Sequence, residues 1–266
     1  MTREVNDMKT KNPLIVAAAI LVLLLTVLFG TRPAYYLYRE LEYQQGEPSD
    51  AARQVHAYAQ EMDIPYGAYP KDLIALLETN PETEEFVLCY PFRTEQDVTL
   101  ASDRDAVPLF LQWDTMWGYE KYGSSYLAVT GCGPTCLAMV GYYLTGDINM
   151  TPHQIAQFAQ RNGYYEKGYG SSWKLISEGS GKLGLTATEL PLVKSKLVKA
   201  LEAGSPVILA MGPGDFTTSG HYIVLTGVEE GGFTVNDPNS RERSRQLWTY
   251  AQLEGQIRNI WAISKA

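Results

Sequence analysis

One cysteine of the chain lies in a context that would activate a thiol. Cys132 belongs to the run TGCGPT, residues 130–135, where helical periodicity predicts that a helix begins. The free N–H groups and partial positive charge of a helix N-terminus favour a thiolate, the nucleophilic form of cysteine. The glycines on either side leave space for a substrate backbone. This pattern indicates a catalytic nucleophile, and a small buried side chain at a helix start is the alternative.

The search for a base is narrow because the chain has only three histidines. His221 opens the apolar run 221–228, which is typical of a buried strand, and its ordinary pKa near neutrality suits a general base or an ion-pair partner of a thiolate. Asp237 ends the returning strand 233–236, where a carboxylate could orient the imidazole, although the run NDPN is also typical of an ordinary turn. Regular pairing leaves His221 and Asp237 out of register, so we expect a bulge or bend in this hairpin.

Attack on a carbonyl also needs a hydrogen-bond donor for the oxyanion, in addition to the backbone N–H of the cysteine. Gln112 lies in the run LFLQWD, residues 109–114, where a polar amide stands among apolar and aromatic side chains. We therefore take Gln112 as the candidate oxyanion donor.

A structural zinc site is a competing interpretation of the same residues. Cys136 follows Cys132 by four residues, so both sulfurs would share one helix face, and His221 with Asp237 could complete a set of four ligands. Cys136 is otherwise a packed thiol in the helix interior. Because nothing else in the sequence supports a metal, we expect no metal and no cofactor.

The elements that must position these residues are helices followed by an antiparallel sheet. Helical patterns cover residues 132–144, 152–161 and 194–203. Buried-strand patterns cover residues 206–211 and 221–228, and a hairpin loop at 230–232 returns the chain. This order predicts an α+β fold.

The first thirty residues predict a membrane anchor. Residues 14–30 read LIVAAAILVLLLTVLFG, which as a helix would span about 25 Å. The preceding bases keep the N-terminus, residues 1–12, in the cytoplasm and place the body outside the cell membrane. We therefore expect a single-pass protein whose anchor covers residues 13–30. A cleaved signal peptide, which would release a secreted protein, is the alternative.

The net charge of −8 is concentrated in one segment. Residues 33–105 contain fifteen acidic and five basic residues, whereas residues 106–266 contain thirteen of each. A chain of this charge is unsuited to nucleic acid, whose phosphates require a basic surface. We interpret residues 31–105 as an acidic, mostly helical stem and residues 106–266 as a separate domain.

Four motifs together resemble a known family. Gln112 is followed in order by GCGPT at 131–135, GHY at 220–222 and NDP at 236–238. As a set they resemble the papain-like cysteine peptidases related to the bacteriocin-processing family, which trims leader peptides after a double glycine. The resemblance covers about residues 106–266.

The resemblance implies a papain-like fold and a role for each residue. A helical half would carry Cys132 as the nucleophile, and an antiparallel sheet half would carry His221 as the base and Asp237 as its orienter. Gln112 would be the oxyanion donor. These roles imply a thiol hydrolase that cleaves peptide or amide bonds, with a peptide or protein as its substrate.

The sequence departs from the family members that are fused to an ATP-binding transporter. The run GSGK at 179–182 is followed by Leu183, where a phosphate-binding loop requires Ser or Thr, so we expect no nucleotide partner. A stand-alone, membrane-anchored extracytoplasmic peptidase is the resulting prediction. The alternative is a non-catalytic papain-like binding module, suggested by Trp113 and Trp117 beside the expected cleft, although such aromatic side chains are more often part of a core.

Overall fold

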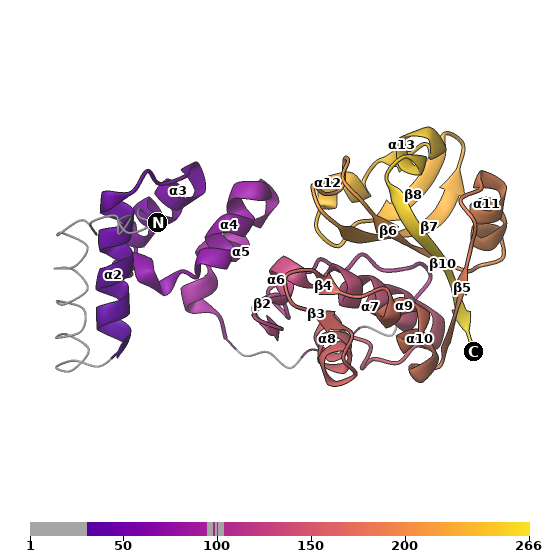
Figure 1. The fold of residues 1–266 in the computed structure, drawn as a ribbon, viewed down its shortest axis with the longest axis horizontal. Helices are drawn as coiled ribbons and strands as arrows, with labels where there is room; N and C mark the ends of the chain where they lie inside the picture. The colour runs from indigo at the N-terminus through magenta and orange to yellow at the C-terminus, as the bar shows by residue number, and fades with distance from the viewer. Residues whose placement is uncertain (1–30, 95–97, 99, 101–103) are drawn as a thin grey trace, which may run out of the picture. The chain divides into compact units, whose positions relative to one another are not determined.

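The computed structural model describes residues 31–94, 98, 100 and 104–266, which divide into two compact units, Met1–Glu78 and Thr79–Ala266 (Figure 1). The predicted anchor at 13–30 lies outside the described residues. Among the residues that are described, no helix is both long and apolar enough to cross a bilayer.

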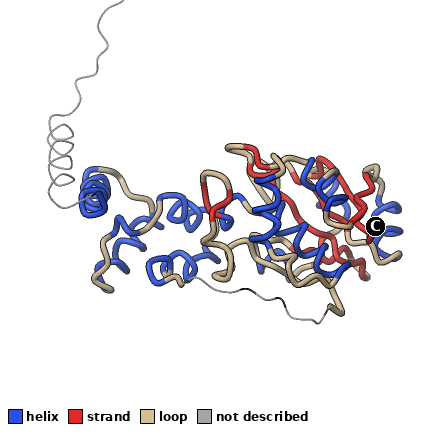
Figure 2. Tube along the Cα trace, turned by 90° about the horizontal axis from the view of Figure 1, so that it is seen from below, coloured by secondary structure: helices blue, strands red, loops and turns tan. Residues whose placement is uncertain are grey.

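The described part of the first unit is helical and contains no strand (Figure 2). Helix α3 begins at Asp50, where the Ser49 side chain caps it by accepting a hydrogen bond from the backbone N–H of Ala52. Arg39 is buried and donates to the carbonyl oxygen of Tyr69 at 3.1 Å. The elements are α2 (Thr31–Gln45), α3 (Asp50–Glu61), η1 (Tyr66–Ala68) and α4 (Lys71–Thr79).

The second unit begins with short helical elements that composition alone assigns to the stem. Residues 79–94 belong with the cysteine-bearing unit, which therefore starts well before residue 106. These elements are η2 (Pro81–Thr83), α5 (Glu84–Leu88) and η3 (Tyr90–Phe92).

A helical half follows. Its central helix α7 starts at Cys132, as predicted, and ends at Gly146, whose φ of +73° is the left-handed conformation that glycine adopts without strain. Thr151 caps the next helix by accepting from the N–H of Gln154. The elements are β1 (Lys121–Tyr122), β2 (Ser125–Tyr126), α6 (Leu127–Thr130), α7 (Cys132–Thr145), α8 (Pro152–Arg161), β3 (Tyr165–Glu166), β4 (Gly170–Ser171), α9 (Lys174–Ser177) and α10 (Gly179–Lys182).

The other half is a six-stranded antiparallel sheet in the order β5-β10-β6-β7-β8-β9. Figure 1 shows the sheet beside the helices α7 to α10. The elements are β5 (Leu185–Glu189), α11 (Lys194–Glu202), β6 (Val207–Met211), β7 (His221–Glu229), β8 (Gly232–Asn236), α12 (Arg241–Ser244), β9 (Leu247–Trp248), α13 (Tyr250–Glu254) and β10 (Ile257–Lys265).

Both faces of the sheet are covered, which explains why β6 is apolar throughout. Ile208 and Ala210 belong to the core that includes α7, whereas Val207, Leu209 and Met211 belong to the core on the opposite face, under α11. Successive side chains of a strand point to opposite faces, so a strand covered on both sides is a continuous apolar run. The expected α+β fold is confirmed.

The β7–β8 hairpin contains the expected bulge. The pairing shifts by one residue between Leu225 and Gly227, and beyond the shift Val224 pairs with Asn236. A one-residue shift turns a strand's side chains to the other face. Carried one residue further, this register sets Asp237 opposite Ile223, on the face of His221, whereas unshifted pairing would set it on the other face.

Candidate active site

Cys132 is the first residue of α7 and is half-buried. Each neighbouring glycine is required by a close contact. A Cβ at Gly131 would lie 2.4 Å from the carbonyl oxygen of Leu127, and a Cβ at Gly133 would lie 2.8 Å from the hydroxyl of Ser171 on β4. The glycines therefore allow α6 and β4 to approach the start of the helix that presents the thiol.

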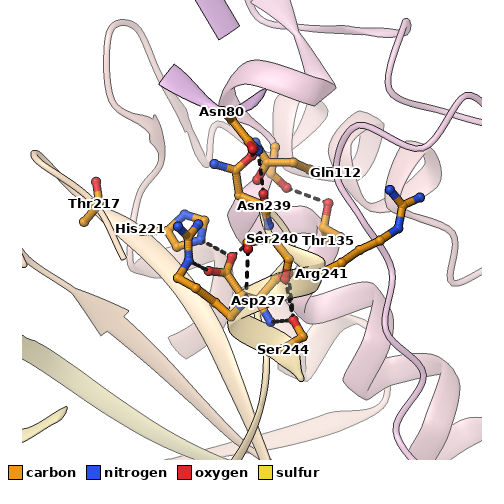
Figure 3. Close-up of polar contacts among 12 residues, drawn as sticks. Asn80, Gln112, Thr135, Thr217, His221, Asp237, Asn239, Ser240, Arg241 and Ser244 are labelled. Carbon is orange, nitrogen blue, oxygen red and sulfur yellow. Dashed lines mark hydrogen bonds and ion pairs between the residues drawn. The ribbon is translucent and has the colours of Figure 1, made fainter. Parts of the chain in front are cut away.

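His221 and Asp237 form a buried hydrogen-bonded pair. The His221 Nε2 lies 2.8 Å from Asp237 Oδ1, and the two side chains are 7% and 0% exposed. This bond uses Nε2 and leaves Nδ1 for a second partner. His221 begins β7 and Asp237 directly follows β8, so both lie at the open end of the hairpin, where Figure 3 shows them bonded to each other.

Three further groups hold the carboxyl end of β8. Arg243 Nε donates to Asp237 Oδ2 at 2.5 Å, and the backbone N–H of Asn239 donates to Oδ1 at 2.8 Å. The backbone N–H of Asp237 donates to the hydroxyl of Ser244 at 2.9 Å. Arg243 was not predicted from the sequence, where its only signal is a cation six residues after the carboxylate, in the run RERSR.

The electrostatics of the pair favour an ionised state. Burial lowers the pKa of His221, but the Asp237 carboxylate and the Cys132 side chain raise it, with a net result of about 10. Burial raises the pKa of Asp237, but His221 and Arg243 outweigh it, so that this pKa lies below its ordinary value. The raised pKa of His221 and the lowered pKa of Asp237 therefore both favour an imidazolium paired with a carboxylate.

Cys132 and His221 line one cleft of about 640 Å³, a size typical of ligand sites. Its helical side includes the aromatic side chains of Tyr169 and Trp173, which are 87% and 49% exposed. Its sheet side includes Arg258. The cleft can therefore offer both apolar and charged contacts to a ligand that reaches the thiol.

Trp113 and Trp117 belong to the core, which is the more common place for such aromatic side chains, and they do not line the cleft. Both are buried, and their indole N–H groups donate to the carbonyl oxygens of Asn239 and Leu111 at 3.2 and 2.7 Å. Tryptophan in a protein interior commonly satisfies its N–H in this way. These two side chains stabilise the second unit and do not form a binding surface.

Gln112 lies between the cysteine turn and the aspartate loop. Its Nε2 donates to the carbonyl oxygen of Ala128 at 2.7 Å, and its backbone N–H donates to the carbonyl oxygen of Pro238 at 2.7 Å. The side chain is buried, and among the described residues it is not one that lines the cleft. One of the two amide hydrogens is used by Ala128, which leaves one for another acceptor.

The zinc alternative finds no support. Within the part of the chain that the structure describes, no cluster of three or more His, Cys, Asp or Glu side chains could hold a metal ion. Cys136 is fully buried, and its pKa is raised by burial. The imidazole of His221 is instead bonded to Asp237.

A cleft between a helical half with a cysteine at a helix start and an antiparallel sheet with a histidine–aspartate pair defines the papain-like class of fold. Residues 104–266 match the Peptidase_C39 like family, and the chain therefore belongs to that family. This confirms the resemblance to the bacteriocin-processing peptidases and gives the class of protein, the C39-like peptidases.

Two solved structures are similar to the chain. The first is the peptidase domain of Streptococcus ComA, a bi-functional ABC transporter involved in a quorum-sensing pathway, with 17% identity and a TM-score of 0.43, covering 60% of this chain and 99% of that one. The second is a C39-like peptidase from Bacillus anthracis, with 18% identity and a TM-score of 0.36, covering 64% of this chain and 100% of that one. No curated protein matches the chain.

Proposed function

We propose that this protein is a peptidase in which Cys132 is the nucleophile, His221 the general base and acid, and Asp237 the residue that orients the imidazole. One observation carries the proposal. The buried hydrogen bond of 2.8 Å between His221 and Asp237 lies at the cleft that the Cys132 thiol also lines. A nucleophile, a base and an orienting carboxylate in that relation are the minimum set for acyl transfer.

The reaction has two halves. The Cys132 thiolate attacks the scissile carbonyl carbon, and the resulting tetrahedral intermediate collapses when the His221 imidazolium gives its proton to the departing amine. A thioester on Cys132 remains. Neutral His221 then takes a proton from water, the hydroxide attacks the thioester, and the acid product leaves with the thiolate restored.

The oxyanion of each intermediate requires two donors. The backbone N–H of Cys132, at the N-terminus of α7, is the first, and the remaining amide hydrogen of Gln112 is the second. The carbonyl of Ala128 holds the Gln112 amide close to the cysteine turn, which supports this role. Because the amide is buried, the donor would need no reorientation of solvent when charge develops.

The location of the activity follows from the first thirty residues. We infer that residues 13–30 anchor the protein in the cell membrane and that the peptidase unit acts on peptides outside the cytoplasm. The uninterrupted apolar run and the bases before it support this proposal. Protease protection of the second unit in sealed cells would contradict it.

Labelling with a thiol-alkylating activity probe, combined with a peptide-library turnover assay, tests the proposed function. Cys132→Ala should abolish both labelling and turnover, whereas the matched variant Cys136→Ala should keep them because that thiol is buried away from the cleft. Equal labelling of the two variants would exclude Cys132 as the nucleophile. Ligand binding by both the native protein and Cys132→Ala, with no turnover by either, would instead identify a non-catalytic binding module.

A further inference from the structure

The segment at residues 79–92, which we call the brace, lies before the part of the chain that matches the family. It belongs to the same compact unit as the cleft. The brace contacts the aspartate loop, residues 237–244, through polar side chains (Figure 3). None of these contacts is used by the mechanism described above.

Asn80 holds the loop at Asn239, whose backbone contacts one carboxylate oxygen of Asp237. Its Nδ2 donates to the backbone carbonyl oxygen of Asn239 at 2.7 Å and lies 3.1 Å from the Asn239 side-chain oxygen. The backbone N–H of Asn239 in turn donates to Asp237 Oδ1, the oxygen bonded to His221. The Asn80 side chain is itself buried.

Glu82 holds the loop at the start of helix α12, which carries the side chain that contacts the other carboxylate oxygen of Asp237. The Glu82 carboxylate accepts the backbone N–H of Arg241 at 2.8 Å and the hydroxyl of Ser240, at the start of the short helix α12. That helix carries Arg243, whose Nε donates to Asp237 Oδ2. Both oxygens of the aspartate are therefore held by groups that the brace fixes.

The other end of the brace packs on the half that carries the cysteine. The Phe86 and Tyr119 rings stack at 4.2 Å, and the Tyr119 hydroxyl donates to the Phe86 carbonyl oxygen at 2.7 Å. The hydroxyls of Tyr90 and Tyr126 are hydrogen-bonded at 2.8 Å, and Tyr126 directly precedes α6, which leads to Cys132. The brace thus connects the two halves of the peptidase.

We propose that Asn80 and Glu82 are positioning residues of the peptidase, which fix the loop that aims Asp237 at His221. The inference rests on the proposed role of Asp237. A fully buried carboxylate needs all of its partners in place, and the brace adds side-chain hydrogen bonds at Asn239, Ser240 and Arg241 to a loop that Gln112 and Trp113 also contact. The brace is then part of the catalytic unit, although it lies outside the family match. Asn80 precedes Asp237 by 157 residues in the sequence.

The test compares Glu82→Gln and Asn80→Ala with Glu84→Gln in the full chain. Glu84 is exposed on α5 and supplies a matched loss of one carboxylate in the same segment. The imidazole signal of His221, one of only three histidines, is followed by NMR against pH. We expect the His221 pKa to fall by about one pH unit in the two brace variants and to stay unchanged in Glu84→Gln.

Turnover supplies the second measurement. We expect kcat to fall by about tenfold in the brace variants, with KM unchanged and the alkaline limb of the pH profile moved to lower pH. A wild-type His221 titration in both folded variants would overturn the inference. If Glu82→Gln does not fold, the His221 titration and kcat of Asn80→Ala test the inference alone, because Asn80 acts on the same loop through a different contact. Absence of turnover in the native protein would refute the proposed function alone, since the titration reports on the brace independently.

Discussion

Two histidine–carboxylate pairs of almost equal length occupy different surroundings in this protein. In the first unit His56 Nε2 lies 2.9 Å from Glu40 Oε1, and in the second unit His221 Nε2 lies 2.8 Å from Asp237 Oδ1. The Glu40 side chain is 31% exposed, whereas that of Asp237 is fully buried. Distance alone therefore does not distinguish a structural pair from a candidate catalytic pair.

The difference lies in what surrounds each pair. His56 stacks on Tyr43 at 4.0 Å and packs edge-on against Tyr66, so its ring is part of an aromatic cluster. The first unit has no cysteine in its sequence. Asp237 instead has a guanidinium, the backbone N–H of Asn239 and the Ser244 hydroxyl as additional partners, and its histidine faces a thiol. What marks the candidate reactive pair is the set of additional hydrogen bonds to the carboxylate, together with a nucleophile next to the imidazole.

The largest expected effect separates the two histidines. His221→Ala should lower kcat/KM by about 10³-fold, because the proton donor and acceptor is lost. His56→Ala should leave kcat/KM unchanged and reduce the free energy of unfolding of the first unit by about 1 kcal/mol, because the stacked ring is lost. Peptide turnover and denaturant unfolding of both variants test this prediction. A comparable loss of turnover in His56→Ala would remove the distinction between the pairs.

A smaller effect is expected from the guanidinium behind Asp237. Arg243→Gln should lower kcat by about tenfold, because Oδ2 loses its charged hydrogen bond and the carboxylate is less firmly held. Arg245→Gln is the matched control, since Arg245 is exposed two residues later. Steady-state kinetics of the two variants check the prediction. Equal kcat values would show that the hydrogen bonds from His221 and from the backbone N–H of Asn239 suffice to hold the Asp237 carboxylate.

The smallest effect is on stability against pH. The pKa of His221 is raised above its ordinary value of 6.5 to about 10 in the folded protein, so its pairing stabilises the fold fully below pH 6.5 and loses this effect as the pH rises towards 10. The melting temperature of the second unit should therefore exceed that of Asp237→Asn at neutral pH, and the difference should narrow at alkaline pH. A difference that stays constant to pH 11 would contradict the ionised pair.

Sequence patterns predicted the parts of the site that depend on local structure. The helix start at Cys132, the strand that opens at His221 and the need for an irregular hairpin all follow from periodicity and turn chemistry within short windows. The two glycines around the thiol were also recognisable, although the contacts with Leu127 and Ser171 give a further reason for them.

Contacts between distant segments could not be predicted in this way. Arg243 contacts Asp237 because the short helix α12 follows the loop and brings the guanidinium back to the carboxylate. Asn80 contacts Asn239 although more than 150 residues separate them in the sequence. Acidic composition grouped Glu82 with the stem, whereas its carboxylate accepts hydrogen bonds from the aspartate loop. The indoles of Trp113 and Trp117 lie in the core and not at the cleft, and the sequence left both placements open because aromatic residues near a site have no local signal of the direction in which they point.

Because β7 contains a bulge, the alignment of the proposed catalytic pair depends on the exact number of residues in each strand of the hairpin. Thr226 is the residue at which the pairing shifts, and its hydroxyl is hydrogen-bonded to that of Thr234 at 2.9 Å. A chain lacking one residue of β8 would retain every side chain of the proposed mechanism, yet Asp237 would then lie opposite Val224 and turn to the other face of the sheet from His221. Comparison of catalytic residues alone would classify such a homologue as active, whereas the spacing between His221 and Asp237 would reveal the lost alignment.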